Sequence, residues 1–196
     1  MLVIGLVGAI GAGKSEVMRL LEGLGARTVA ADELSREVLA PGQPALAEVR
    51  AAFGDDYFDA TGALQRRKLG ERVFQDEAAR RRLDAIVHPH MTAALQRRLA
   101  QWRAAGVGVA VVESAVLEEM GARPLVDRVV RVTAPFAVRL ARLMARDGSS
   151  EAEARRRLDA HHRLGLEAPP ADYEIENAGD RAQLRTRVEH LWAELV

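Results

Sequence analysis

The sequence contains no cysteine, and its 28 basic and 28 acidic side chains leave it without net charge. The lack of cysteine excludes disulfide bonds, cysteine-ligated zinc and a cysteine nucleophile. Charge balance removes any general attraction to polyanions, so neither nucleic acid nor an anionic membrane is an expected partner.

Long apolar runs are also absent. No stretch approaches the ~20 residues that a membrane-spanning helix requires. The segment MLVIGLVGAIG is apolar, but it lacks the basic region of a signal peptide and continues directly into a glycine-rich loop. We therefore expect a cytoplasmic protein of one domain, spanning residues 1–196, that is a monomer or a weak homo-oligomer.

Lysine is scarce, because only Lys14 and Lys68 occur among the 28 basic residues. Lys14 lies in GLVGAIGAGKSE, residues 5–16, which fits the pattern G-x-x-x-x-G-K-[ST] between a predicted strand and a predicted helix. In such a loop the backbone N–H groups bind nucleotide phosphates and the hydroxyl of Ser15 binds Mg²⁺. The residues predicted to bind ATP are Gly8, Gly11, Ala12, Gly13, Lys14, Ser15 and Glu16.

Glu16 occupies a position where such loops often carry a second hydroxyl. A carboxylate pointing toward the phosphates would oppose their binding, whereas an acid in the first helical turn interacts favourably with the helix dipole. We expect the side chain of Glu16 to face solvent and its backbone N–H to be available to a phosphate.

Short apolar runs alternate with helical patterns along the chain. Five runs predict strands, at residues 2–7, 28–31, 108–112, 128–133 and 173–175. Apolar residues at helical spacing predict helices, at Met91, Leu95, Leu99 and Trp102 and again at Leu184, Val188, Leu191 and Leu195. This alternation predicts an α/β fold with a parallel sheet flanked by helices, and residues 32–106 form a helical lobe.

Two carboxylates lie where predicted strands end. Asp32 follows the second run at the sheet edge that carries the glycine loop, where it could accept a proton from an attacking hydroxyl or orient Mg²⁺. It could equally cap a helix over residues 33–39. Glu113 ends the third run, where it could contact substrate, act on Mg²⁺ through water, or satisfy backbone donors.

Five further segments, in order, resemble the dephospho-CoA kinase family of P-loop small-molecule kinases. They are ADELSREVLAPGQPAL (31–46), GALQRRKLGERVF (62–74), HPH (88–90), RLMARDG (142–148) and ADYEIENAG (171–179). The resemblance implies a P-loop kinase fold with five parallel strands, a helical acceptor-binding lobe and a lid over residues 135–169. It also implies ATP-dependent phosphorylation of the ribose 3′-hydroxyl of dephospho-CoA.

The resemblance implies a role for each matching residue. Asp32 would be the base, and Lys14, Arg146 and Arg142 would neutralise the phosphoryl group. Asn177 would lie near adenine. The acceptor side would be lined by Arg36, Arg66 and His88.

The chain departs from the family pattern around the acceptor side. Ala30 replaces a second aspartate, Ala115 replaces a proline, and His161 stands where the lid usually has glutamine. These departures leave two alternatives, namely another small-molecule kinase such as a nucleoside monophosphate kinase, or a non-catalytic nucleotide-binding homologue. Adjacent residues on a helix diverge, so His161 and His162 are not expected to share a metal ion.

Overall fold

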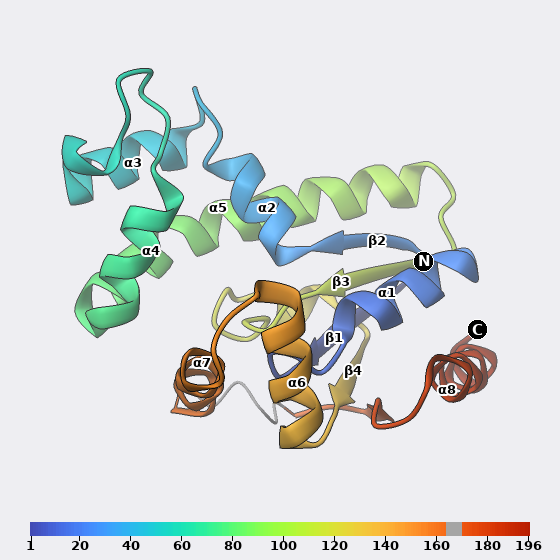
Figure 1. The fold of residues 1–196 in the computed structure, drawn as a ribbon. Helices are drawn as coiled ribbons and strands as arrows, with labels where there is room; N and C mark the ends of the chain where they lie inside the picture. Colours follow the sequence, from blue (N-terminus) through green and yellow to red (C-terminus); the bar gives the residue numbers. More distant parts are fainter. Residues whose placement is uncertain (164–169) are drawn as a thin grey trace.

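The computed structural model describes residues 1–163 and 170–196 (Figure 1). It contains one parallel sheet with the strand order β2-β3-β1-β4-β5, which confirms the predicted fold class. The strands are β1 Leu2–Gly8, β2 Arg27–Ala30, β3 Val109–Glu113, β4 Arg128–Thr133 and β5 Tyr173–Glu176. Predicted and observed ends differ by at most one residue. Ala31 moves from the second strand into the helix that follows.

The described residues form eight α-helices. Their bounds are α1 Lys14–Gly23, α2 Ala31–Val38, α3 Pro44–Phe53, α4 Arg66–Gln75, α5 Glu77–Ala104, α6 Phe136–Asp147, α7 Glu151–Arg163 and α8 Arg181–Leu195. Two short 3₁₀ helices, Asp55–Tyr57 and Arg123–Leu125, lie in connections.

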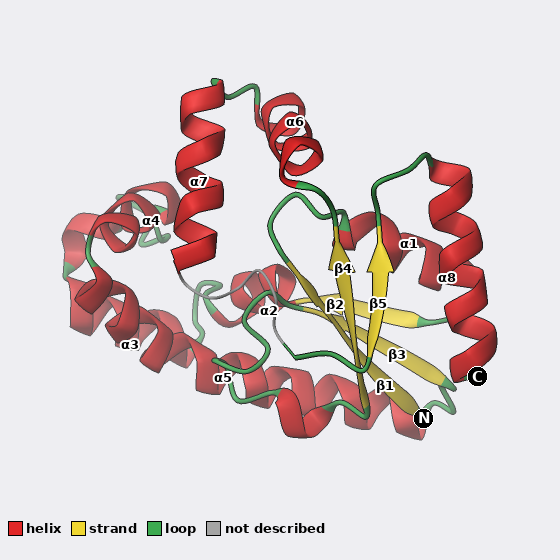
Figure 2. Cartoon of the chain, turned by 90° about the horizontal axis from the view of Figure 1, so that it is seen from below, coloured by secondary structure: helices red, strands yellow, loops and turns green. Residues whose placement is uncertain are grey.

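The central strand β1 is buried on both faces, and its alternating side chains contribute to two cores. Val3 and Val7 pack in the core that includes α2 and α5, whereas Ile4 and Leu6 pack in the core that includes α1 and α8. Figure 2 shows α5 on one side of the sheet and α8 on the other. A strand covered on both faces explains the continuous apolar run in the sequence.

The predicted helical lobe, residues 32–106, is not separate from the body of the molecule. Its α3 and α4 stand to one side of the sheet in Figure 1. The second half of α5, however, places Met91, Leu95 and Leu99 in the core against the sheet. The 28-residue α5 therefore links the lobe to the body, and it continues through Pro89 without ending there.

The predicted lid contains α6 and α7, which pack together through a small apolar cluster of their own. Its buried members are Leu140, Leu143, Ala154 and Leu158. Residues 164–169, which the lid prediction includes, lie outside the described residues. Within the part of the chain that the structure describes, no helix is both long and apolar enough to cross a membrane.

Candidate active site

The glycine loop joins β1 to α1 at the carboxyl edge of the sheet. Gly13 precedes the first residue of α1 and has a φ of 96°, in the region that favours glycine. A Cβ atom at this position would also overlap the side-chain amide of Asn177. The loop therefore needs glycine at Gly13 both for its backbone turn and for contact with a neighbouring segment.

Asn177 follows β5, and its side chain contacts the glycine loop. The residue is 5% exposed, and its Nδ2 donates to the Ala12 carbonyl at 2.9 Å. Its Oδ1 accepts a hydrogen bond from Arg142 of α6 at 3.1 Å. Arg142 also donates to the Ala12 carbonyl at 3.2 Å and to the Asn177 carbonyl at 3.1 Å. These bonds connect the loop, the end of β5 and the lid helix α6.

Asn177 and Arg142 make contacts within the protein that the resemblance did not imply. The hydrogen bonds of the Asn177 side chain run to Ala12 and Arg142, and Asn177 does not line the cavity described below. Arg142 lines that cavity while its guanidinium bonds to backbone and amide oxygens. A contact of Asn177 with adenine stays a prediction, as does a phosphoryl contact of Arg142.

The ammonium group of Lys14 lies among backbone carbonyl oxygens of the glycine loop. Its Nζ donates to the Gly8 carbonyl at 3.0 Å and lies 3.6 Å from Glu113 Oε1. Burial lowers the pKa of Lys14, and the charges of Glu113 and Asp32 oppose that shift. Burial likewise raises the pKa of Glu113, which Lys14 opposes. Lys14 is thus a largely desolvated cation whose partners are a backbone carbonyl and the carboxylate of Glu113.

A cavity of about 610 Å³ opens between the loop, the ends of β2 and β3, and the lid. Its volume lies in the range of small-molecule sites. Its lining brings together residues from four separate segments that were predicted to act in catalysis or to bind Mg²⁺ or substrate. Those residues are Lys14, Ser15, Asp32, Glu113, Arg142 and Arg146.

Asp32 lies in the first turn of α2 and is exposed to this cavity. The helix begins at Ala31, and its N-cap residue is Ala30. The interpretation of Asp32 as an N-cap is therefore wrong by two positions. Its carboxylate faces the space beside the phosphate loop because parallel strands end at the same edge.

The lid contributes two arginines joined through one carboxylate. Arg146 forms a two-pronged ion pair with Asp147, with distances of 2.7 and 3.0 Å, and Arg157 of α7 pairs with the same carboxylate. The hydrogen bond to Asp147 raises the pKa of Arg146 above its usual value. Asp147 was not singled out from the sequence, although its position directly after Arg146 was the available signal.

Ser15 and Glu16 occupy the first turn of α1. Ser15 is exposed and lines the cavity. Glu16 does not line it. Its carboxylate pairs with Arg19 and with Arg181 at 3.2 Å, and the bond to Arg19 lowers its pKa. The side chain of Glu16 therefore points away from the cavity, as expected, and pairs there with two exposed arginines. Its backbone N–H, which was expected to be available to a phosphate, bonds instead to the Gly13 carbonyl at 3.0 Å.

The hydroxyl and carboxylates at the cavity suit a hard cation such as Mg²⁺, which prefers few protein oxygens and retains water or phosphate ligands. Among the described residues, no cluster of three or more histidines and carboxylates forms a metal site. The residues that could hold such a cation are Ser15, Asp32 and Glu113, which line the same cavity.

The three predicted acceptor-side residues lie outside this cavity. Arg66 of α4 approaches the Arg36 carbonyl of α2 at 3.4 Å, and burial lowers its pKa, with a further contribution from the Arg36 charge. A contact of Arg36 and Arg66 with the acceptor stays a prediction. His88 lies on α5 and lines a second cavity, away from the loop.

Comparison with known proteins agrees with this geometry. The model of the dephospho-CoA kinase family matches residues 2–183. A dephospho-CoA kinase of Geobacter sulfurreducens is 42% identical over 97% of both chains. That of Anaeromyxobacter dehalogenans is 44% identical over all of this chain and 92% of its own.

Solved structures share the fold. A crystal structure from Thermus thermophilus aligns over 100% of this chain and 98% of its own, with a TM-score of 0.77 and 29% identity. A dephospho-CoA kinase from Campylobacter jejuni aligns over 98% and 96%, with a TM-score of 0.69 and 23% identity. With its phosphate loop, carboxylates and lid arginines around one cavity, the chain belongs to the dephospho-CoA kinase family.

Proposed function

We propose that this enzyme transfers the γ-phosphoryl group of Mg-ATP to the ribose 3′-hydroxyl of dephospho-CoA and so forms coenzyme A. The observation that carries the proposal is the convergence of Lys14, Asp32 and Arg146 on one cavity. Family membership supplies the acceptor, and the cavity supplies the residue types that phosphoryl transfer needs.

The phosphates of ATP would bind the backbone N–H groups of the loop at the start of α1. Lys14 would leave the Gly8 carbonyl and contact phosphate oxygens, where its charge stabilises the transferring group. Mg²⁺ bound to the phosphates, with Ser15 as a protein ligand, would neutralise further negative charge. Arg146 would do the same from the lid side.

Asp32 would accept the proton of the acceptor hydroxyl. The transition state of phosphoryl transfer is loose, so this proton leaves late and positioning of the hydroxyl is the larger contribution. An exposed carboxylate on the first turn of a rigid helix is suited to that task. Closure of α6 and α7 over the cavity would exclude water and limit ATP hydrolysis.

A coupled assay for ADP release, with Mg-ATP and a panel of acceptors, tests the proposal. We expect turnover with dephospho-CoA and none with AMP, CMP or UMP. Turnover with a nucleoside monophosphate alone would indicate the first alternative. ATP binding without turnover on any acceptor would indicate a non-catalytic homologue.

The variant Asp32→Asn tests the assigned base. It should lower kcat about 100-fold or more while ATP binding is retained. The neighbouring Glu33→Gln is the matched control, because Glu33 pairs with Arg98 of α5 rather than lining the cavity. Near-normal turnover of Asp32→Asn would show that another group takes the proton.

A further inference from the structure

His88 is the predicted acceptor-side residue whose surroundings fit that role least. Its side chain is 15% exposed and lines a cavity of about 570 Å³ between α5 and the loop at residues 114–122. Its Nδ1 lies 3.2 Å from the Glu119 carbonyl of that loop. A carbonyl only accepts, so this contact requires Nδ1 to carry the hydrogen.

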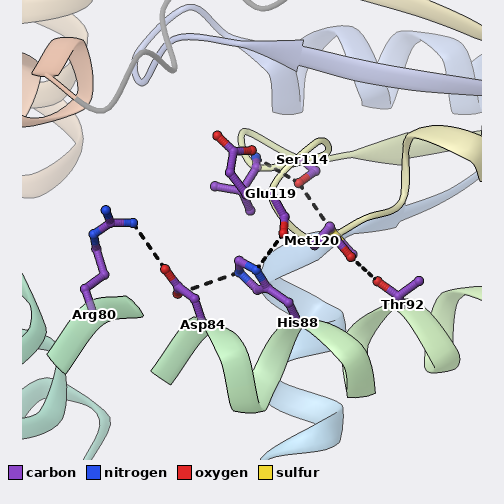
Figure 3. Close-up of polar contacts among 8 residues, drawn as sticks. Arg80, Asp84, His88, Thr92, Ser114, Glu119 and Met120 are labelled. Carbon is purple, nitrogen blue, oxygen red and sulfur yellow. Dashed lines mark hydrogen bonds and ion pairs between the residues drawn. The ribbon is translucent and has the colours of Figure 1, made fainter. Parts of the chain in front are cut away.

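A second residue of the same helix face reinforces this contact. Thr92, one turn after His88, donates its hydroxyl to the carbonyl of Met120 (Figure 3). Residues four apart on a helix lie one above the other, so α5 binds two successive carbonyls of the loop. We call the loop at residues 114–122, held in this way by α5, the anchored loop.

A carboxylate lies on the other side of the ring. The Nε2 atom of His88 is 3.6 Å from Asp84, one turn earlier on α5, which makes an ion pair when the ring is protonated, and Asp84 pairs with Arg80 at 3.1 Å (Figure 3). The charges that line the same cavity are Arg80, Arg81, Asp84 and Glu119. The ring thus lies with Nε2 beside Asp84 and with Nδ1 facing the anchored loop.

The other end of the anchored loop forms part of the active site. Ser114, Ala115 and Val116 line the cavity that contains Lys14 and Asp32. The Ser114 hydroxyl accepts from the Val116 N–H at 3.1 Å and contacts the Met120 sulfur, so the two ends of the loop are connected. The loop follows β3, and β3 lies between β1 and β2. Its first residues therefore lie between the phosphate loop and the helix of Asp32.

We propose that His88 is a positioning residue for phosphoryl transfer, which acts by fixing the anchored loop through the Glu119 carbonyl rather than by binding the acceptor. This proposal rests on the proposed function above. Loss of the anchor would let residues 114–116 shift next to the reacting groups. A shift of that kind lowers the rate strongly, because transfer depends on the alignment of donor and acceptor. The phosphate loop has its own support, so ATP binding would not change.

The test uses the variants His88→Ala, His88→Gln and His88→Asn. The amide nitrogen of asparagine takes the place of Nδ1, whereas that of glutamine reaches the place of Nε2 and misses the carbonyl. We expect kcat/KM for the acceptor to fall about 10-fold in His88→Ala and His88→Gln, with KM for ATP unchanged. His88→Asn should restore most of the loss. If asparagine rescues no better than glutamine, the proposal is wrong.

Hydrogen exchange without substrates provides a readout independent of turnover. Amides of the anchored loop should exchange about five-fold faster in His88→Ala, as for loss of one typical hydrogen bond, and at the normal rate in His88→Asn. Unchanged exchange in His88→Ala would overturn the anchor even if activity falls. If His88→Ala does not fold, Thr92→Val replaces it and should loosen the same amides. If the native enzyme does not use dephospho-CoA, the proposed function fails. Hydrogen exchange of the anchored loop then still tests whether His88 holds that loop.

Discussion

Replacing Asn177 with alanine tests whether the phosphate loop depends on a residue 165 positions away. The substitution removes the hydrogen bond to the Ala12 carbonyl and the charged hydrogen bond from Arg142. A neutral bond contributes about 0.5–1.5 kcal/mol and a charged one about 1.5–3 kcal/mol. Arg142 keeps three carbonyl acceptors, so the lower end of the sum, about 2 kcal/mol, is expected.

For a domain of this size, 1 kcal/mol corresponds to about 2–4 °C in the melting temperature. Asn177→Ala should therefore melt about 4–8 °C below the unaltered protein in calorimetry. Its affinity for ATP should also fall, because the carbonyl of Ala12 and the adjoining N–H groups lose their support. Glu176→Gln is the matched control, since that neighbouring carboxylate is exposed and pairs with a surface arginine, Arg187.

The reasoning would be refuted by a small effect on both quantities. If Asn177→Ala unfolds within about 0.5 kcal/mol of the unaltered protein and binds ATP equally well, the loop holds its shape without this brace. If stability falls but ATP affinity does not, Asn177 stabilises the end of β5 without shaping the phosphate site.

Three further results are expected in and beside the phosphate loop. The variant Lys68→Arg leaves Lys14 as the only lysine in the sequence, so its ¹³Cε signal in NMR can be followed alone. The pKa of Lys14 read from that signal should lie below the ordinary lysine value, and adding Glu113→Gln should lower it further. The free energy of unfolding should fall as pH rises from 4.5 through the raised pKa of Glu113, because in that pH range the native state binds more protons than the unfolded state. In denaturation of Glu113→Gln this pH-dependent loss of stability should be absent. Gly13→Ala should abolish ATP binding in calorimetric titration, because its Cβ overlaps a buried amide at a φ of 96°.

The features predictable from the sequence were those encoded over short distances. The phosphate loop needs Gly8, Gly13, Lys14 and Ser15 within eight positions, so its spacing identifies it directly. Strands β1 and β3 were also readable, because a strand covered on both faces is almost continuously apolar. Even so, the end of β2 was misplaced, since nothing local distinguishes Ala31 as the first residue of a helix from the last residue of a strand.

The parts that escaped prediction depend on pairs of residues far apart in the chain. His88 was assigned to the acceptor side from its motif, yet its partner is a backbone carbonyl 31 residues later. A carbonyl has no sequence signature, so no pattern could reveal that contact. The brace of Asn177 on Ala12 was hidden for the same reason. The ion pairs of Glu16 likewise depend on Arg181, from the last helix.

The resemblance implies a second aspartate where this chain has Ala30, and that difference bears on how the remaining carboxylates work. Ala30 ends β2 and pairs in register with Glu113. Glu113 is already desolvated, and the charge of Asp32 raises its pKa further. A third carboxylate beside Glu113 would add like-charge repulsion there and would oppose the approach of nucleotide phosphates. Ala30 avoids both costs, but it also leaves Asp32 as the exposed carboxylate on α2 facing the cavity. Proton removal in this chain should therefore depend on Asp32 more completely than where a second aspartate is at hand.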